Sequence, residues 1–327
     1  MLKLCTAKII ADSISEKGKR ITTFELEYPR IIHSELMTHR VFSRNAMSSR
    51  AVPVNKMLQQ VMENPAMPVR FGVNQRGMED GGDHDQKIRV EYTDLEFSPE
   101  EFWKEAAKNA AWHAEKFALA GYHKQVCNRL VEPFQRMKTV VTSTEWNNFF
   151  HLRCWHDADP TIQMLANCMW EAMTNSTPEI LKPGQWHTPY VEHVYLDGEF
   201  NYAVRDTEGK LCILDTKEAL SISASCCAQV SYRNIDSTFE KADSVAKKLI
   251  GGDRIHASPY EHQATPMDHD NAMERLNYYL SSCEITQDIS TWQEGVTHQD
   301  RDGKFWSANF CGWVQHRQLL NNHFVKG

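Results

Sequence analysis

The chain has 327 residues, of which 41% are hydrophobic and 24% are charged, so it can bury a substantial core as one large domain or two small ones. The formal net charge of -7 argues against broad electrostatic binding to nucleic acid, although a local basic cluster can still hold a phosphate. The first residues are too short an apolar run for a signal peptide, and no later stretch approaches a membrane span. We therefore expect a cytoplasmic protein that binds neither nucleic acid nor membrane.

The nine cysteines are scattered along the chain and form no Cys-x-x-Cys motif. This pattern predicts neither a disulfide framework nor a zinc ribbon, and we expect the thiols to be reduced. Cys226 and Cys227 lie in a run of small residues, which favours burial on a helix over a nucleophilic role.

The first predicted strand covers residues 21–28, where apolar and polar side chains alternate. Pro29 ends this strand, and a helical stretch is expected from Ile32. Residues 72–98 contain glycine, aspartate and few apolar side chains, so they predict a long loop. We interpret it as a surface insertion, with an active-site lid as the alternative.

A capping box at Ser98-Pro-Glu-Glu101 predicts the start of a helix that runs to about Asn128 and belongs to the core. Its expected buried stripe consists of Phe102, Ala106, Ala110, His113 and Phe117. A second helical region is predicted from Thr144 to about Met173, with a break near Asp159-Pro160, where the aspartate can cap a new helix.

The C-terminal half predicts a hairpin over residues 202–214 and a further helix. A capping box at Ser237-Thr-Phe-Glu240 is expected to begin this helix, and Gly251 to end it. Its predicted buried stripe consists of Ala242, Val245, Ala246 and Leu249. The whole pattern is mixed α and β with helices dominant, and it shows no internal repeat.

Residues 35–50 concentrate three arginines, a histidine and several hydroxyl and amide side chains. Arginine offers two parallel donors to a phosphate, and serine hydroxyls complete the oxygen shell, so Ser48, Ser49 and Arg50 have the chemistry of a monophosphate site. The alternative is a surface helix whose arginines pair with carboxylates elsewhere.

This cluster resembles the signature of the flavin-dependent thymidylate synthase family, in which Arg-His-Arg is followed by seven residues and a serine. Here Thr38-His39-Arg40 is followed after seven residues by Ser48, with Ser43, Asn45 and Arg50 also matching. The resemblance implies that His39, Arg40 and Asn45 contact FAD. It further implies that Ser48, Ser49 and Arg50 hold the nucleotide phosphate at a neighbouring subunit's site.

The chain departs from the family pattern at three positions: Thr38 stands for the first arginine, Ala46 for a glutamate, and Glu35 for a glutamine that would contact substrate.

A second segment, residues 127–173, resembles the C-terminal helical part of the same family. By that resemblance Arg136 is a second phosphate-binding arginine, Asn148 faces the flavin, and Arg153 lies over the pyrimidine ring. Taken without the resemblance, Arg153 would be interpreted as a snorkelling or ion-paired arginine.

A third segment combines Ala228-Gln-Val-Ser-Tyr232 with His256-Ala-Ser-Pro-Tyr-Glu-His262 and is similar to a family element that binds flavin. The resemblance places Ser231, Ser258 and Glu261 at the flavin and His256 near the reacting centre. As a histidine pair, His256 and His262 lack a third ligand, so no metal site is predicted.

The order of these segments differs from the family, since the third segment usually precedes the arginine cluster. We therefore expect an α+β fold of the flavin-dependent thymidylate synthase type, with helices around an antiparallel sheet and a circularly permuted chain. Gln315-His316-Arg317 weakly resembles Thr38-His39-Arg40. The expected domain spans residues 1–327, with insertions near 72–98 and 183–215.

The resemblance implies transfer of a one-carbon unit from methylene-tetrahydrofolate to carbon 5 of dUMP, with FAD as cofactor and NADPH as reductant. Arg153 would activate the ring, and Ser48 and His256 would position the reactants. The family builds its sites between the subunits of a homotetramer and binds a pyrimidine deoxynucleoside monophosphate. The alternatives are a hydroxymethylase acting on dUMP or dCMP, an inactive flavin- or nucleotide-binding subunit, and a nucleic-acid-binding protein, which the net charge disfavours.

Overall fold

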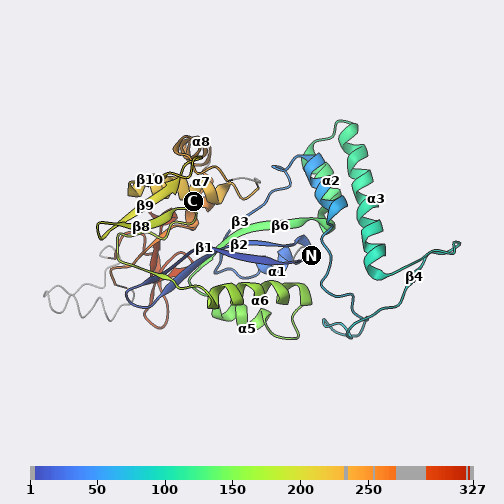
Figure 1. Ribbon diagram of the computed structural model, residues 1–327. Coiled ribbons are helices and arrows are strands. Elements are labelled where there is room, and N and C mark those ends of the chain that lie inside the picture. The colour runs from blue at the N-terminus through green and yellow to red at the C-terminus, as the bar shows by residue number, and fades with distance from the viewer. Residues whose placement is uncertain (1–3, 232–234, 253–254, 270–291, 322, 325–327) are drawn as a thin grey trace.

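A five-stranded sheet lies at the centre of the protein (Figure 1). The computed structural model describes residues 4–231, 235–252, 255–269, 292–321 and 323–324. The strand order is β3-β6-β2-β1-β7, antiparallel except for the parallel pair of β1 and β7. The strands are β1 (Thr6–Ser15), β2 (Arg20–Pro29), β3 (Ser43–Ala46), β6 (Arg136–Ser143) and β7 (Glu179–Leu181). The expected antiparallel sheet is thus present, with one parallel strand at its edge.

Helices cover one face of this sheet and form the largest apolar core (Figure 1). They are α1 (His33–Met37), which follows the 3-10 turn η1 (Arg30–Ile32), α5 (Asn147–Arg153) and α6 (Pro160–Thr174). Asp159 caps α6 as expected, because its carboxylate accepts from the backbone N–H groups of Thr161 and Ile162. The helix expected from Ile32 is only five residues long, and the residues that follow it pair with β6 as strand β3.

The opposite face packs against the C-terminal half of the chain (Figure 1). This half contains α7 (Thr216–Ala228), α8 (Phe239–Leu249) and the sheet of β8 (Glu192–Leu196), β9 (Glu199–Arg205) and β10 (Leu211–Leu214). Its last part holds η3 (Ser258–Glu261), β11 (Ala264–Pro266), β12 (His298–Gln299), β13 (Phe305–Ser307), β14 (Phe310–Cys311), β15 (Trp313–Gln315) and η5 (His316–Leu319). The hairpin predicted over 202–214 is confirmed as β9 and β10.

The expected capping box at Ser237 is wrong by one residue. Thr238 is the N-cap of α8, and its hydroxyl accepts from the backbone N–H of Lys241. The carboxylate of Asp236 binds both the backbone N–H and the hydroxyl of Thr238, which fixes the start of the helix there.

A helical layer at one end of the sheet is formed by α2 (Val54–Glu63), α3 (Pro99–Leu119), α4 (Lys124–Cys127) and η2 (Asn128–Phe134). The capping box of Ser98 and Glu101 is confirmed, and α3 contributes to a smaller hydrophobic core with α2 and η2. Its buried face consists of Ala107, Ala111 and Ala114, one residue out of step with the expected stripe, and Phe102 and Phe117 are exposed. The helix ends at Leu119 because Gly121 adopts a positive φ of 84°.

The loop predicted over residues 72–98 is confirmed, apart from one short hairpin within it. The two strands of this hairpin, β4 (Ile88–Arg89) and β5 (Glu96–Phe97), have two residues each. It projects beyond α3 at the edge of the molecule (Figure 1). No helix among the described residues is long and apolar enough to cross a membrane.

A buried chain of hydroxyls and imidazoles crosses the interface between the sheet and the C-terminal half. Ser13 Oγ bonds His187 Nδ1 at 2.9 Å, and His187 Nε2 bonds Thr23 Oγ1 at 2.8 Å. Thr23 Oγ1 bonds Thr142 Oγ1 at 2.7 Å, and Thr142 bonds His262 Nδ1 at 2.8 Å. We call these five residues the buried relay; burial lowers the pKa of His262 to about 3 and that of His187 well below its usual range.

Acid is expected to destabilise the fold through these two histidines. The unfolded chain takes up a proton on each near pH 6.5, whereas the folded chain keeps both neutral, so the free energy of unfolding falls as the pH drops. Each histidine contributes a loss of about 1.4 kcal/mol between about pH 7.5 and about pH 5.5. Urea unfolding at both pH values is the measurement.

His262→Gln is the matched variant, because it should reduce this loss of stability by about 1.4 kcal/mol, the contribution of one histidine. An identical pH dependence in the wild type and the variant would contradict the assignment.

Candidate functional site

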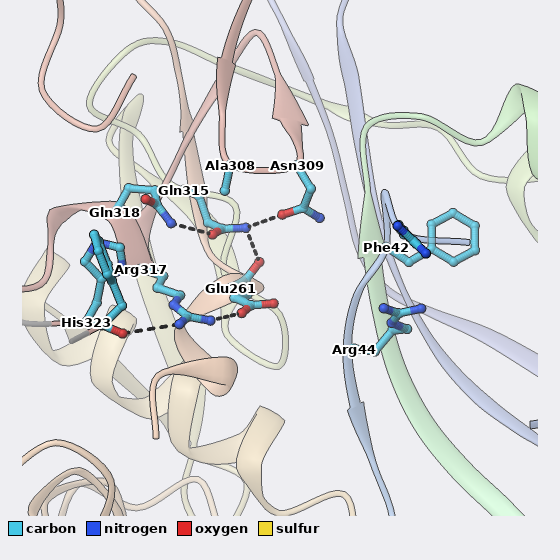
Figure 2. Close-up of a pocket in the computed structure, with 11 residues that line it drawn as sticks. Phe42, Arg44, Glu261, Ala308, Asn309, Gln315, Arg317, Gln318 and His323 are labelled. Atoms are coloured by element: carbon cyan, nitrogen blue, oxygen red, sulfur yellow. Dashed lines mark hydrogen bonds and ion pairs between the residues drawn. The ribbon is translucent and has the colours of Figure 1, made fainter. Parts of the chain in front are cut away.

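Two facing walls form a cleft of about 460 Å³ at the edge of the central sheet (Figure 2). One wall comes from the entry to β3, and the other comes from η3, residues 308–318 and residues 323–324. We call it the arginine cleft; the side chains that determine its chemistry are Arg40, Arg44, Glu261, Asn309, Gln315 and Arg317. It brings together residues from opposite ends of the sequence.

The side-chain amides of Asn309 and Gln315 connect the two walls by hydrogen bonds. Asn309 donates to the backbone oxygen of Val41 at 2.9 Å and lies within hydrogen-bond distance of the Ser43 hydroxyl. Gln315 is 1% exposed and donates to the backbone oxygen of Glu261 at 3.3 Å. Its side chain also contacts Asn309 (Figure 2) and the Ser43 hydroxyl. Strand β3 is therefore tied by side chains to the second wall.

The charge of the arginine cleft is predominantly positive. Arg317 forms an ion pair with Glu261, which neutralises one of its three guanidinium groups (Figure 2). Arg44 donates to the backbone oxygens of Met37 and His39, and burial lowers its pKa. Three guanidinium groups beside one carboxylate suit a ligand with two negative charges.

A second cluster joins α1 to α5 around Arg153. The guanidinium donates from Nε to Nε2 of His39 at 3.1 Å, and Nη1 lies 3.3 Å from Oε2 of Glu35. Nη2 lies 3.5 Å from the Thr38 hydroxyl. Arg153 is thus ion-paired, as the interpretation without a family resemblance expects, and its position is fixed by three neighbours.

The titratable groups around Arg153 are shifted by burial. Burial lowers the pKa of His39 to about 4, with Arg153 and Arg44 adding to the effect, so this imidazole is neutral and accepts from Arg153. Burial also raises the pKa of Glu35; Asp159 adds to this shift and Arg153 opposes it. The guanidinium is the one permanent charge of the cluster.

A cavity of about 670 Å³ lies between β2, β6, α2 and the end of α7. We call it the lysine cavity; its polar lining residues are Glu27, Lys56, Gln60, Arg136, Lys138 and Ser231, and its apolar ones include Met47, Val52, Met57 and Val230. The Ser231 hydroxyl accepts from the backbone N–H of Ser48 at 3.0 Å, so the 48–51 turn borders the cavity.

The residues expected at the site fall into distinct places. Arg40 and Glu261 line the arginine cleft, Arg136 and Ser231 line the lysine cavity, and Glu35, His39 and Arg153 form the cluster between α1 and α5. Ser48, Ser49 and Arg50 occupy the turn between β3 and α2. The side chain of Asn45 points inward and donates to the backbone oxygen of Cys227.

Asn148, His256 and Ser258 line neither cavity and belong to neither cluster, and all three are exposed. The site residues expected from the sequence leave out four arginines and lysines that line the cavities. Two of them could have been found from the sequence, because Arg44 lies inside the basic cluster and Arg317 lies in the segment that weakly resembles Thr38-His39-Arg40. No sequence feature distinguishes Lys56 and Lys138, because single lysines are common in helices and strands.

The cysteines of α7 are buried as predicted, and burial raises the pKa of Cys226 to about 12 and that of Cys227 well above its usual range. Such thiols are poor nucleophiles. Within the described ranges, no group of three histidine, cysteine or acidic side chains is arranged to hold a metal ion.

Comparison with known proteins finds similarity to one family over about half of the chain. A family model described as "Thymidylate synthase complementing protein" matches residues 20–179. No curated protein matches the chain. Thymidylate synthase X from Helicobacter pylori, crystallised with FAD and dUMP, is similar at 14% identity and a TM-score of 0.33, over 47% of this chain and 67% of that chain.

A UMP/dUMP methylase, PolB, from Streptomyces cacaoi, bound to 5-Br dUMP, is similar at 14% identity and a TM-score of 0.38, over 52% of this chain and 90% of that chain. The resemblance expected from the sequence is confirmed: over residues 20–179 this chain matches the thymidylate synthase complementing protein family.

Proposed function

We propose that this chain is a flavin-dependent enzyme that transfers a one-carbon unit from methylene-tetrahydrofolate to carbon 5 of dUMP and so produces dTMP, with NADPH reducing the flavin. One observation carries the proposal. Arg40 and Glu261, which the resemblance assigns separately to the flavin, line the same cleft although they are far apart in the sequence.

The arginine cleft suits part of an FAD molecule. Its volume of about 460 Å³ lies within the range of about 300–1,000 Å³ common to small-molecule sites. Guanidinium groups bind phosphate oxygens through paired donors, and Arg40, Arg44 and Arg317 would face the diphosphate. When bound, the flavin supplies the hydride that completes the methyl group.

The remaining chemistry assigned to this chain is orientation and charge stabilisation. Arg153, fixed by Glu35 and His39, is proposed to stabilise the negative charge that develops on the pyrimidine ring. Because His39 is neutral, it adds no competing positive charge there. Ser48 and His256 are proposed to position the reactants, and no cysteine nucleophile is needed.

The nucleotide phosphate is assigned to Ser48, Ser49, Arg50 and Arg136, with Glu35 near the base. The exposure of Asn148, His256 and Ser258 supports sites shared between the subunits of a homotetramer, because an exposed side chain is free to reach a neighbouring copy. The approach of η3 and segment 308–317 to β3 supports the proposed circular permutation.

A hydroxymethylase that acts on dUMP or dCMP is the second candidate. The carboxylate of Glu35, 3.3 Å from Arg153, favours it, because the family has a neutral amide at this position. A carboxylate accepts hydrogen bonds and donates none, so it changes which base edge can be bound.

Mass spectrometry of the nucleotide product distinguishes these functions. The protein is incubated with FAD, NADPH and methylene-tetrahydrofolate, and with dUMP or dCMP in separate reactions. We expect the mass of dUMP to rise by that of one methylene unit. A hydroxymethyl product, or reaction of dCMP, would favour the second candidate, and bound flavin without product would indicate an inactive binding subunit.

Flavin binding is expected to depend on the arginine cleft. Arg317→Gln removes a guanidinium that lines it and should weaken FAD binding about tenfold, which is the scale of one charged hydrogen bond. Titration of the apoprotein with FAD measures this. Arg205→Gln on β9 is the charge-matched control, because this exposed arginine pairs with Glu192 away from the cleft. Equal affinities in all three proteins would remove the cleft from the flavin site.

Turnover is expected to depend on Arg153. Arg153→Ala should reduce the rate of product formation by about 10² to 10³, the cost of losing a group that stabilises transition-state charge. The variant should retain FAD, because Arg153 does not line the arginine cleft. Single-turnover rates and flavin content are the two measurements, and full activity in the variant would contradict the role.

A further inference from the structure

Two buried side-chain amides lie behind the turn formed by residues 48–52. They belong to Asn128 in η2 and to Gln135, the residue after η2, and both residues are 0% exposed. We infer that they are positioning residues: Asn128 holds the 48–52 turn in its ligand-binding conformation, and Gln135 fixes Asn128 relative to Arg136. This inference rests on the proposed function, which assigns the nucleotide phosphate to that turn and to Arg136.

Asn128 binds the turn through both hydrogens of its amide. Nδ2 donates to the backbone oxygen of Ser49 at 2.8 Å and to that of Val52 at 2.9 Å. Because both partners are acceptors, the nitrogen of the amide must face them, so the orientation of this side chain is fixed. An uncharged group with two donors suits a buried position, where an unpaired charge would be costly.

Further hydrogen bonds hold the turn from other directions. Lys124 Nζ in α4 donates to the backbone oxygen of Ala51 at 3.3 Å, and the backbone N–H of Ser48 donates to Ser231 Oγ at 3.0 Å. The carbonyl oxygens of three turn residues are thus engaged by η2 and α4. A carbonyl oxygen repels the oxygens of a phosphate, so this arrangement directs three negative dipole ends toward protein donors rather than toward an anionic ligand.

Gln135 connects Asn128 to the start of β6. Its Nε2 donates to the backbone oxygen of Asn128 at 2.5 Å, and Arg136 follows it directly in the chain. The backbone of Gln135 is itself held, because its oxygen accepts from the N–H of Arg30 at 2.9 Å. Two buried amides in series therefore set the separation between the 48–52 turn and Arg136.

The oxygen atoms of both amides are buried, and among the described residues neither accepts a hydrogen bond. A buried polar atom without a partner lowers stability. Both positions thus keep an amide at a cost to the fold, which favours a requirement for its N–H groups over a role in packing.

Binding titrations of Asn128→Ala with dUMP and with deoxyuridine test the inference. Without its two bonds the turn should occupy the binding conformation about a tenth of the time, so dUMP affinity should fall about tenfold. Deoxyuridine affinity should not change, because the residues of the turn are assigned to the phosphate alone. Asn128→Ser restores one donor and should lose only about threefold.

Turnover gives a second readout. The KM for dUMP should rise by the same factor in Asn128→Ala while kcat stays unchanged, because saturating nucleotide restores the turn. Equal weakening of dUMP, deoxyuridine and FAD would indicate a general loss of structure and would overturn the inference.

Amide hydrogen exchange of the ligand-free protein measures the turn directly. The N–H of Ala51, which donates to the backbone oxygen of Ser48, should exchange about tenfold faster in Asn128→Ala. Unchanged exchange would overturn the inference. Faster exchange with unchanged dUMP affinity would also overturn it and would leave the proposed function intact.

Gln263→Ala is the matched control. Gln263 is also 0% exposed, its amide donates to Ser223 Oγ at 3.0 Å, and it lines neither cavity. This variant should bind dUMP as the wild type does.

Inorganic phosphate, titrated in parallel, separates the two proposals. If the wild type binds phosphate but not dUMP, and Asn128→Ala binds phosphate about tenfold more weakly, the positioning role stands and the proposed function fails alone. A wild type that binds neither ligand would overturn both.

Discussion

The buried relay is the constraint on which the rest of the structure depends. Its hydroxyls belong to β1, β2 and β6, whereas its two imidazoles come from the C-terminal half, so each hydrogen bond of an imidazole joins one layer to the other. Buried polar groups are costly unless they are paired, so the two halves can pack in few other relative positions. His262 directly follows Glu261, and the relay therefore also sets where the second wall of the arginine cleft lies.

Strand β3 places the first wall of the arginine cleft opposite this second wall. It has only four residues, yet the arginine cleft lies at its beginning and the lysine cavity borders the turn after its end. Its alternation places Ser43 and Asn45 against the C-terminal half and leaves Arg44 toward the cleft. A short edge strand can border two cavities because both of its ends are free of the sheet, while its middle is fixed by pairing with β6.

The sequence predicts the local elements better than their assembly. Residues 21–28, the Ser98 capping box, the Asp159 cap and the 202–214 hairpin are all confirmed, because each depends on neighbouring residues alone. The helix near Ile32 was predicted, but its early end and strand β3 were not, since pairing with β6 overrides local helix preference there. Arg40 and Glu261 were found by resemblance, whereas Lys56 and Lys138 belong to a cavity that only the packing of α2 on the sheet creates.

The bonds between Ser43 and Asn309 join residues that are 266 positions apart in the chain, and this separation has a consequence for the protein during its synthesis. At the usual elongation rates of about 5–20 residues per second, roughly 15–50 s pass between the appearance of the first wall and that of the second. The sheet can form once β6 and β7 have been synthesised, but Arg40 and Arg44 face no partner wall until segment 309–317 follows. The arginine cleft is thus among the last features of the protein to be completed during translation.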